Sequence, residues 1–360
     1  AIRDQAKISA NTLTMSAMQR APTAVSALRT LTHSLPIPAI ERCVSNPTLP
    51  MRAPLFAKVR EQLLYNYLVR TPSCVRAIEL LKAEGARVHN DHVALRSFNV
   101  GSGGSGLAFL EEIFLAFGYA AEQPITIPGL PVNARWFEPP EMTDWPKVFI
   151  SEMRTESLPR EVADIISHHV QGYYTTDAAR AALESDDAEA LVKVLEVPPW
   201  NVSAAEEEAV RAMGVANPKL ASAVEYAAWT LTHAHRWNHM TILLNGSRLP
   251  GVATLQELNE FFYKDGFVFN KAGGADGFTQ GSAAVRLEQS STKADLVGHT
   301  FACGTVRQVP CSFLELIHRH EGFRGFLGQN AKGIFDSTSN MESVMMPPLA
   351  EPQPAVDARL

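Results

Sequence analysis

Cysteine is scarce in this chain, with only Cys43, Cys74, Cys303 and Cys311 among 360 residues. No two of them form a Cys-x-x-Cys pair, so a zinc knot is not expected. A chain of this length can build a core without a disulfide framework. The sequence therefore predicts reduced thiols in an intracellular compartment.

Long apolar runs and clusters of one charge are also missing. No apolar run reaches about 18 residues, so we expect no transmembrane helix and no membrane partner. The 32 Lys and Arg residues and the 38 Asp and Glu residues are mixed along the chain and leave a net charge of −6 at pH 7. Without a basic stripe, nucleic-acid binding is not expected. The hydrophobic share of 46% is typical of a soluble globular protein.

Most local catalytic motifs are absent as well. The chain contains no GxxxxGK[ST], HExxH, GxSxG or EF-hand pattern. The segment GSGGSG at 101–106 matches GxGxxG between an expected strand and helix. However, no acidic residue follows about 20 residues later at a strand end, and no series of βαβ units follows. We interpret 101–106 as a loop, and a nicotinamide oxidoreductase stays a minor alternative.

The two ends differ in composition from the rest. Residues 1–50 are rich in Ala, Ser, Thr and Arg, and their only acids before Cys43 are Asp4 and Glu41. This composition is typical of an organelle transit peptide, with a disordered arm as the alternative. Residues 339–360 are rich in Pro and Ala and predict a loose tail. We expect one catalytic domain over 51–338.

Helical spacing begins this domain, with a break at Pro72 and a stop at Gly85. Residues 88–153 then read as strand, helix and three strands. Residues 154–235 are mostly helical, and the first pattern returns from residue 236, with a helix beginning after Thr254 and ending at Gly266. Its last three strands are expected at 282–292, 295–302 and 310–319.

Two copies of strand–helix–strand–strand–strand predict an internal structural repeat. We therefore expect an α+β fold of two βαβββ modules that enclose a cleft, preceded by helices. Module one would span 85–153, a helical insertion 154–235, and module two 236–338.

Candidate metal ligands lie on three expected strands. Because side chains alternate along a strand, His92 shares a face with Arg96. His239 occupies the corresponding first strand of module two, and Glu315 lies in the middle of the last strand among apolar residues. A buried carboxylate needs a cation or a metal, and two histidines with one carboxylate form the facial triad that holds non-haem Fe(II). For His92 alone, a hydrogen-bonded core histidine is the alternative.

Four other histidines offer rival sites. His233 and His235 form an HxH pair, but no carboxylate follows at a usable spacing, so we place them at the surface or behind the ligands. His318 and His320 come at the end of the last strand and form a rival set with Glu321. A strand end is a poor place for a dry pocket.

Several of these segments together resemble a known family. The segments HNDHVALRSF, VNARWFEPP, VFISEM, RWNHMTI, LEQSSTKAD and FLELIHR are similar to the 2-oxoadipate dioxygenase/decarboxylase (hydroxyglutarate synthase) family, especially its plant plastid members. The resemblance covers 55–338. The segment FLELIHRHEGFRGFLGQNAKGIFDS also resembles the C-terminal part of 4-hydroxyphenylpyruvate dioxygenase. Both likenesses imply vicinal-oxygen-chelate-like modules.

The resemblance implies Fe(II) held by His92, His239 and Glu315, with Arg96 contacting a substrate carboxylate. It implies that 2-oxoadipate and O2 are converted to 2-hydroxyglutarate and CO2, in lysine catabolism. Gln289 and Ser290 are candidates to line the substrate pocket. The expected location is a plastid, in the chloroplast or amyloplast stroma, with the mitochondrion as the alternative. Another vicinal-oxygen-chelate metalloenzyme acting on a 2-oxo acid, or a non-catalytic plastid scaffold, remains open.

Overall fold

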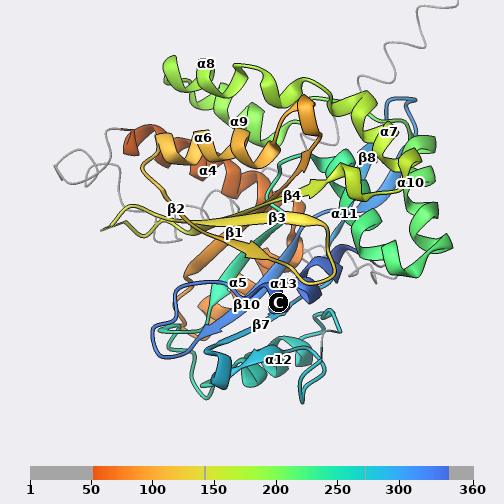
Figure 1. The fold of residues 1–360 in the computed structure, drawn as a ribbon. Helices are drawn as coiled ribbons and strands as arrows, with labels where there is room; N and C mark the ends of the chain where they lie inside the picture. Colours follow the sequence, from red (N-terminus) through yellow and green to blue (C-terminus); the bar gives the residue numbers. More distant parts are fainter. Residues whose placement is uncertain (1–51, 142, 272, 340–360) are drawn as a thin grey trace, which may run out of the picture.

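The computed structural model describes residues 52–141, 143–271 and 273–339 (Figure 1). The expected transit-peptide-like arm, and all of the expected tail except Ser339, lie outside the described residues.

Two N-terminal helices open the described chain, α4 (Ala53–Arg70) and α5 (Pro72–Ala83). Pro72 occupies the first position of α5, where its missing N–H costs no helical hydrogen bond. The chain leaves α5 through Gly85, whose φ of 71° lies in the left-handed region that glycine adopts freely. The expected break and stop are both confirmed.

Module one follows in the expected order. It consists of β1 (Asn90–Asn99), α6 (Gly106–Ala116), β2 (Ala120–Thr126), β3 (Val132–Glu138) and β4 (Lys147–Arg154). The Ser105 side chain caps α6 by accepting a hydrogen bond from the N–H of Ala108. The GSGGSG segment thus forms a tight loop and helix start that packs against the domain.

Five helices separate the two modules. They are α7 (Arg160–Val170), α8 (Ala178–Glu184), α9 (Ala188–Glu196), α10 (Ala204–Ala216) and α11 (Ala221–His233). Ser203 and Glu206 form a reciprocal capping box at the start of α10, which satisfies two otherwise unpaired backbone N–H groups. The helical block expected from the sequence over 154–235 is thus confirmed.

Module two contains β5 (His239–Leu243), α12 (Leu255–Lys264), β6 (Gln280–Ser282), β7 (Leu287–Ser291) and β10 (Phe313–Arg319). The strand expected over 282–292 is divided, because the backbone turns through a short 3-10 segment and Arg286 adopts a φ of 62°. Helix α13 (Gly328–Phe335) ends the module.

The strand expected over 295–302 lies outside the main sheet. It forms β8 (Leu296–Thr300), which pairs with β9 (Val306–Pro310) in a separate two-stranded sheet. The three sheet strands of module two after its helix are therefore β6, β7 and β10. The β8–β9 hairpin is inserted between the last two, which corrects the expected strand assignment.

The eight remaining strands form one sheet in the order β2-β3-β4-β1-β5-β10-β7-β6. In each module the first and last strands are parallel neighbours, β1 with β4 and β5 with β10. The modules meet where β1 and β5 pair antiparallel. The strand order is thus the same when read outward from this junction in either direction, as a twofold repeat requires.

Helices cover this sheet at both ends (Figure 1). Helix α6 contacts β1 and β4 of module one, and α12 contacts β7 and β10 of module two. The core is continuous across the modules and includes the fully buried rings of Phe98, Phe137 and Phe262. Within the described residues, no helix is long and apolar enough to cross a membrane.

Candidate metal centre

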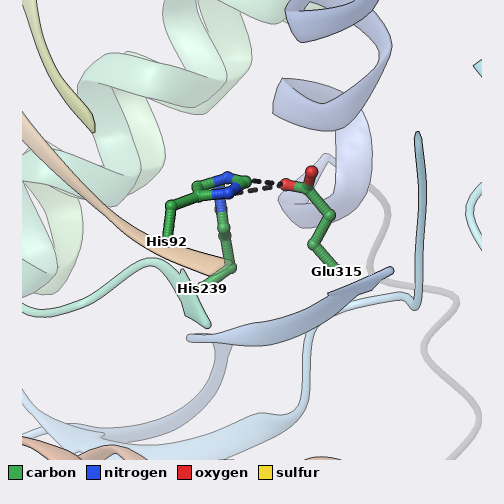
Figure 2. Close-up of side chains that lie close together, drawn as sticks. All are labelled: His92, His239 and Glu315. Carbon is green, nitrogen blue, oxygen red and sulfur yellow. Dashed lines mark ion pairs between the residues drawn. The ribbon is translucent and has the colours of Figure 1, made fainter. Parts of the chain in front are cut away.

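Three central strands bring His92, His239 and Glu315 together. Strands β1, β5 and β10 are consecutive in the sheet. His239 pairs with Ala94 on one side and with Phe313 on the other. His92 lies two residues before Ala94, and Glu315 lies two residues after Phe313. Because side chains alternate along a strand, a spacing of two keeps His92 and Glu315 on the same face of the sheet as His239. Figure 2 shows the three side chains pointing toward one another.

The three ligand atoms form a compact and buried set. The Glu315 Oε2 atom lies 3.0 Å from His239 Nε2 and 3.6 Å from His92 Nε2. All three residues are at most 6% exposed. Ligands about 2.1 Å from a metal, and at right angles to one another, stand about 3.0 Å apart. The spacing therefore suits a metal ion held between the three side chains.

The Glu315 carboxylate is ionised although it is buried. Burial alone would raise its pKa, but the adjacent imidazoles of His92 and His239 outweigh that effect and hold the pKa well below its usual range. Gln289 Nε2 donates to Glu315 Oε1 at 2.6 Å, which fixes the carboxylate and leaves Oε2 facing the histidines.

His92 is oriented by a carboxylate behind it. Its Nδ1 lies 2.8 Å from Asp91 Oδ2, and Arg319 donates to both Asp91 oxygens at 2.7 Å. The ionised Asp91 favours the tautomer with the proton on Nδ1, so that Nε2 carries a lone pair; in this structure Nε2 lies 3.1 Å from the Thr241 hydroxyl. Burial lowers the pKa of His92, but Glu315 and Asp91 outweigh burial and raise it.

His239 has a more neutral environment. Its Nδ1 lies 3.2 Å from Asn238 Oδ1, which favours a proton on that nitrogen. Burial lowers the pKa of His239 in spite of the nearby Glu315 carboxylate. A neutral imidazole with Nε2 turned to the centre is the form that ligates metals.

A largely apolar cavity adjoins the ligands. Its aromatic walls are Phe149 of β4, Phe326 of the segment before α13, and Phe335 at the end of α13. The remaining lining includes Ala94, Leu95, Ser151, Asn238, Ala331 and Ile334. The segment after β10 and helix α13 thus close the side opposite the sheet. Such a site excludes water and strengthens electrostatic interactions within it.

Arg96 also lines this cavity, as does Gln289. The Arg96 guanidinium is 1% exposed and lies about 5 Å from the ring centres of Tyr226, Trp229 and Phe335. The closest acid, Glu225, lies 3.4 Å from Arg96 Nη1. Arg96 Nε has no hydrogen-bond partner among the described residues. This buried cation therefore keeps capacity to bind an anion.

Ser290 takes a different position from its neighbour Gln289. The two alternate along β7, and Ser290 Oγ donates to Asn259 Oδ1 at 2.6 Å. Ser290 is not among the residues that line the cavity. The structure therefore does not bring Ser290 to the site where the sequence placed it.

The rival histidines lie apart from the centre. His233 Nε2 is 2.9 Å from the Pro310 carbonyl, and His235 Nδ1 is 3.1 Å from the Arg96 carbonyl. Both are buried rather than at the surface. His235 contacts the Arg96 backbone and so lies behind the cavity wall.

Sequence reasoning missed Asp91. Strict alternation places Asp91 on the opposite face from His92, but the β1–β5 pairing is irregular between Asn90 and Val93. The two neighbours contact each other within this irregular stretch. The available signal was an acid directly before a candidate ligand, because ligating histidines commonly donate their second N–H to a carboxylate.

Comparison with known proteins places the chain in a family. A family model described as 2-oxoadipate dioxygenase/decarboxylase matches residues 65–321. The chain belongs to the 2-oxoadipate dioxygenase/decarboxylase family. One member, the chloroplastic 2-oxoadipate dioxygenase/decarboxylase of Arabidopsis thaliana, is 29% identical over 311 residues, which cover 79% of this chain and 77% of the relative.

Solved structures of other proteins agree with this membership. Hydroxyglutarate synthase from Oryza sativa, solved in complex with 2-oxoadipate, is 28% identical with a TM-score of 0.65, over 81% of this chain and 95% of that chain. A putative glyoxalase superfamily protein from Ralstonia eutropha is 20% identical with a TM-score of 0.61, over 83% and 98% of the two chains, and shares the fold. The expected family and the α+β fold class are confirmed.

Proposed function

We propose that this chain holds one Fe(II) ion through His92, His239 and Glu315 and converts 2-oxoadipate and O2 to 2-hydroxyglutarate and CO2. The observation that carries the proposal is the buried convergence of these three side chains in a member of a dioxygenase/decarboxylase family. The lysine-catabolic role expected from the resemblance is part of the proposal.

The donor set supports iron. Two imidazole nitrogens and one carboxylate on one side of an ion form the facial triad of non-haem Fe(II) oxygenases. When bound, Fe(II) supplies adjacent coordination positions for a 2-oxo acid and O2. The chain contributes a single negative charge through Glu315, whose pKa lies well below its usual range. Asp91 and Gln289 hold His92 and Glu315 in their binding orientations.

Arg96 supports a dicarboxylate substrate. A 2-oxo dicarboxylate that binds at the centre through one carboxylate has a second carboxylate to place. Arg96 lines the same cavity, and the contacts of its buried guanidinium to Glu225, Thr338 and the Phe335 carbonyl are all long, at 3.4, 3.3 and 3.4 Å. We propose that it donates two hydrogen bonds to the distal carboxylate. Gln289 also lines this cavity, and we propose that its side chain contacts the substrate there.

Location in a plastid is part of the proposal. The Arabidopsis thaliana relative is named chloroplastic. The Ser-, Thr-, Ala- and Arg-rich residues 1–50 have the composition of a transit peptide.

A metal-content experiment with matched histidine variants tests the centre. His239→Ala removes a proposed ligand, whereas His235→Ala removes another buried histidine only four positions earlier. We expect His239→Ala to lose iron and the O2-dependent formation of 2-hydroxyglutarate and CO2 from 2-oxoadipate. His235→Ala should keep its iron.

Glu315→Gln provides a nearly isosteric third variant, which should also lose iron because the ligand charge is removed. Full iron occupancy in both His239→Ala and Glu315→Gln would overturn the ligand assignment. Iron binding with turnover of other 2-oxo acids, but not of 2-oxoadipate, would overturn the substrate alone.

A further inference from the structure

A second group of potential metal ligands lies at the end of β10. Within residues 52–141, 143–271 and 273–339, two groups of three or more His, Cys, Asp or Glu residues have ligand atoms that all lie within 4.8 Å of one another. One is the proposed iron centre. The other consists of Glu288, His318 and His320.

The strand register explains why these three side chains meet. Glu288 of β7 pairs directly with His318 of β10, and His320 follows two positions later. The even spacing keeps both histidines on one side of the strand, and Glu315 is separated from them by odd numbers of residues. The second group therefore lies on the opposite face of β10 from the proposed iron centre. In Figure 1, β7 and β10 run side by side above α12.

The distances suit a small tetrahedral ion. Glu288 Oε2 lies 2.8 Å from His320 Nε2 and 3.6 Å from His318 Nδ1. Ligands about 2.0–2.1 Å from zinc in tetrahedral geometry are about 3.3 Å apart, and the two observed distances lie on either side of this value. The two imidazole rings already lie 4.1 Å apart between centres. Small side-chain adjustments therefore suffice to bind an ion.

One ligand atom has an unfilled bonding position. His318 Nδ1 is buried and has no hydrogen-bond partner among the described residues. A buried imidazole nitrogen without a partner is costly, and a metal ion satisfies it. The side chains of His318, Glu288 and His320 are 17%, 18% and 22% exposed. Solvent ions can thus reach the group without opening the fold.

We propose that Glu288, His318 and His320 form a second divalent-metal site, which binds Zn²⁺. Two imidazoles and one carboxylate match the nitrogen and oxygen donors that zinc accepts, with water in the fourth position, whereas Ca²⁺ and Mg²⁺ require sites made mostly of oxygen. The carboxylate is Glu288 of the neighbouring strand, and Glu321 has no part in the group.

The position of the site gives it a structural effect. A bound ion joins β7 to the end of β10, from which the chain continues to Phe326 and α13. These continuing segments line the proposed catalytic cavity. Zinc at this corner therefore anchors the start of the segment that closes the cavity. This inference does not depend on the proposed reaction.

Zinc counting on the iron-loaded full chain tests the site. The protein is incubated with Zn²⁺ alone and freed of unbound metal, and its zinc and iron contents and its melting temperature are measured. We expect His320→Ala to bind one zinc ion fewer per chain than the unmodified protein and to lose the zinc-dependent rise in melting temperature. Glu288→Gln should behave in the same way, and both variants should keep their iron.

His169→Ala is the matched control. His169 Nε2 lies 2.9 Å from Glu206 Oε1, which resembles the His320–Glu288 pair, but no third ligand among the described residues completes a group there. The control should keep the full zinc content.

Equal zinc content in the unmodified protein, His320→Ala and Glu288→Gln would overturn the proposal. So would a zinc signal that disappears only in Glu315→Gln, because zinc would then merely replace iron at the other centre. If His320→Ala does not fold, Glu288→Gln decides the question alone.

Discussion

Replacing Asp91 by asparagine tests whether the residues behind the metal ligands set iron affinity. Asp91 accepts two hydrogen bonds from Arg319 and one from His92 Nδ1. An asparagine side chain at this position would present one oxygen acceptor and one N–H₂ donor, so it cannot satisfy both partners. The substitution keeps the side-chain volume, and its effects can therefore be assigned to charge and hydrogen bonding.

Two free energies follow from this environment. The side chains of Asp91 and Arg319 are only 4% and 9% exposed, and breaking such a buried pair by removing one partner costs about 3–5 kcal/mol of unfolding free energy. Losing the carboxylate behind a ligating histidine weakens metal binding by about 10–100-fold. That factor corresponds to about 1.4–2.7 kcal/mol of binding free energy.

Two assays separate these effects. Urea unfolding of the iron-free protein measures the loss of stability, and competition with a chelator measures the iron dissociation constant. Glu152→Gln is the matched control, because Glu152 is 3% exposed and accepts hydrogen bonds from Asn99, Asn133 and Ser105 without lining the cavity. The control should lose stability but keep iron affinity. Unchanged iron affinity in Asp91→Asn would refute the reasoning, as would equal iron loss in both variants.

Three further predictions concern the substrate, the pH dependence of stability and the N-terminal arm. Arg96→Lys should lower kcat/KM for 2-oxoadipate by about 30–100-fold, which corresponds to about 2–3 kcal/mol. Iron content, and turnover of a 2-oxo acid without a distal carboxylate, should change little. An equal loss of kcat/KM for both substrates would show that Arg96 is structural. Burial raises the pKa of Asp295 from 3.8 to about 6, so the folded state holds its proton more tightly and the free energy of unfolding should fall as the pH rises through about 6. Asp295→Asn keeps an acceptor for Ser73. This variant should be more stable than the unmodified protein by about 1–3 kcal/mol at pH 8 but not at pH 4. Equal urea midpoints for the two proteins at pH 8 would contradict this prediction. Deleting residues 1–50 should leave iron content and turnover intact and abolish plastid import of a fluorescent fusion; an inactive or insoluble product would show that the arm belongs to the fold.

Local periodicity was sufficient to place the three proposed ligands on strands. His92, His239 and Glu315 each lie in a short apolar segment whose alternation is visible in the sequence. Which strands are neighbours is a tertiary property, and the repeat of the βαβββ pattern supplied it. The sequence therefore placed these three residues on their strands, and the family resemblance implied that their side chains meet.

Contacts that depend on register were beyond local reasoning. The carboxylate nearest to His318 and His320 is Glu288, because β7 and β10 pair antiparallel at that point, and not the adjacent Glu321. In the same way, Gln289 rather than Ser290 faces the cavity. A shift of one residue in the pairing would exchange these roles, and nothing in one strand alone determines that shift.

The twofold repeat also explains why the proposed centre has three protein ligands rather than four. Two residues after His92 comes Ala94, which pairs with Phe149 of β4, and two residues after His239 comes Thr241, which pairs with Glu315 of β10. Phe149 and Glu315 thus occupy equivalent positions in the two modules. Phe149 lines the cavity but offers no ligand atom. Module one therefore supplies no carboxylate at this position, and the cavity lined by Phe149 and Arg96 adjoins the proposed centre there.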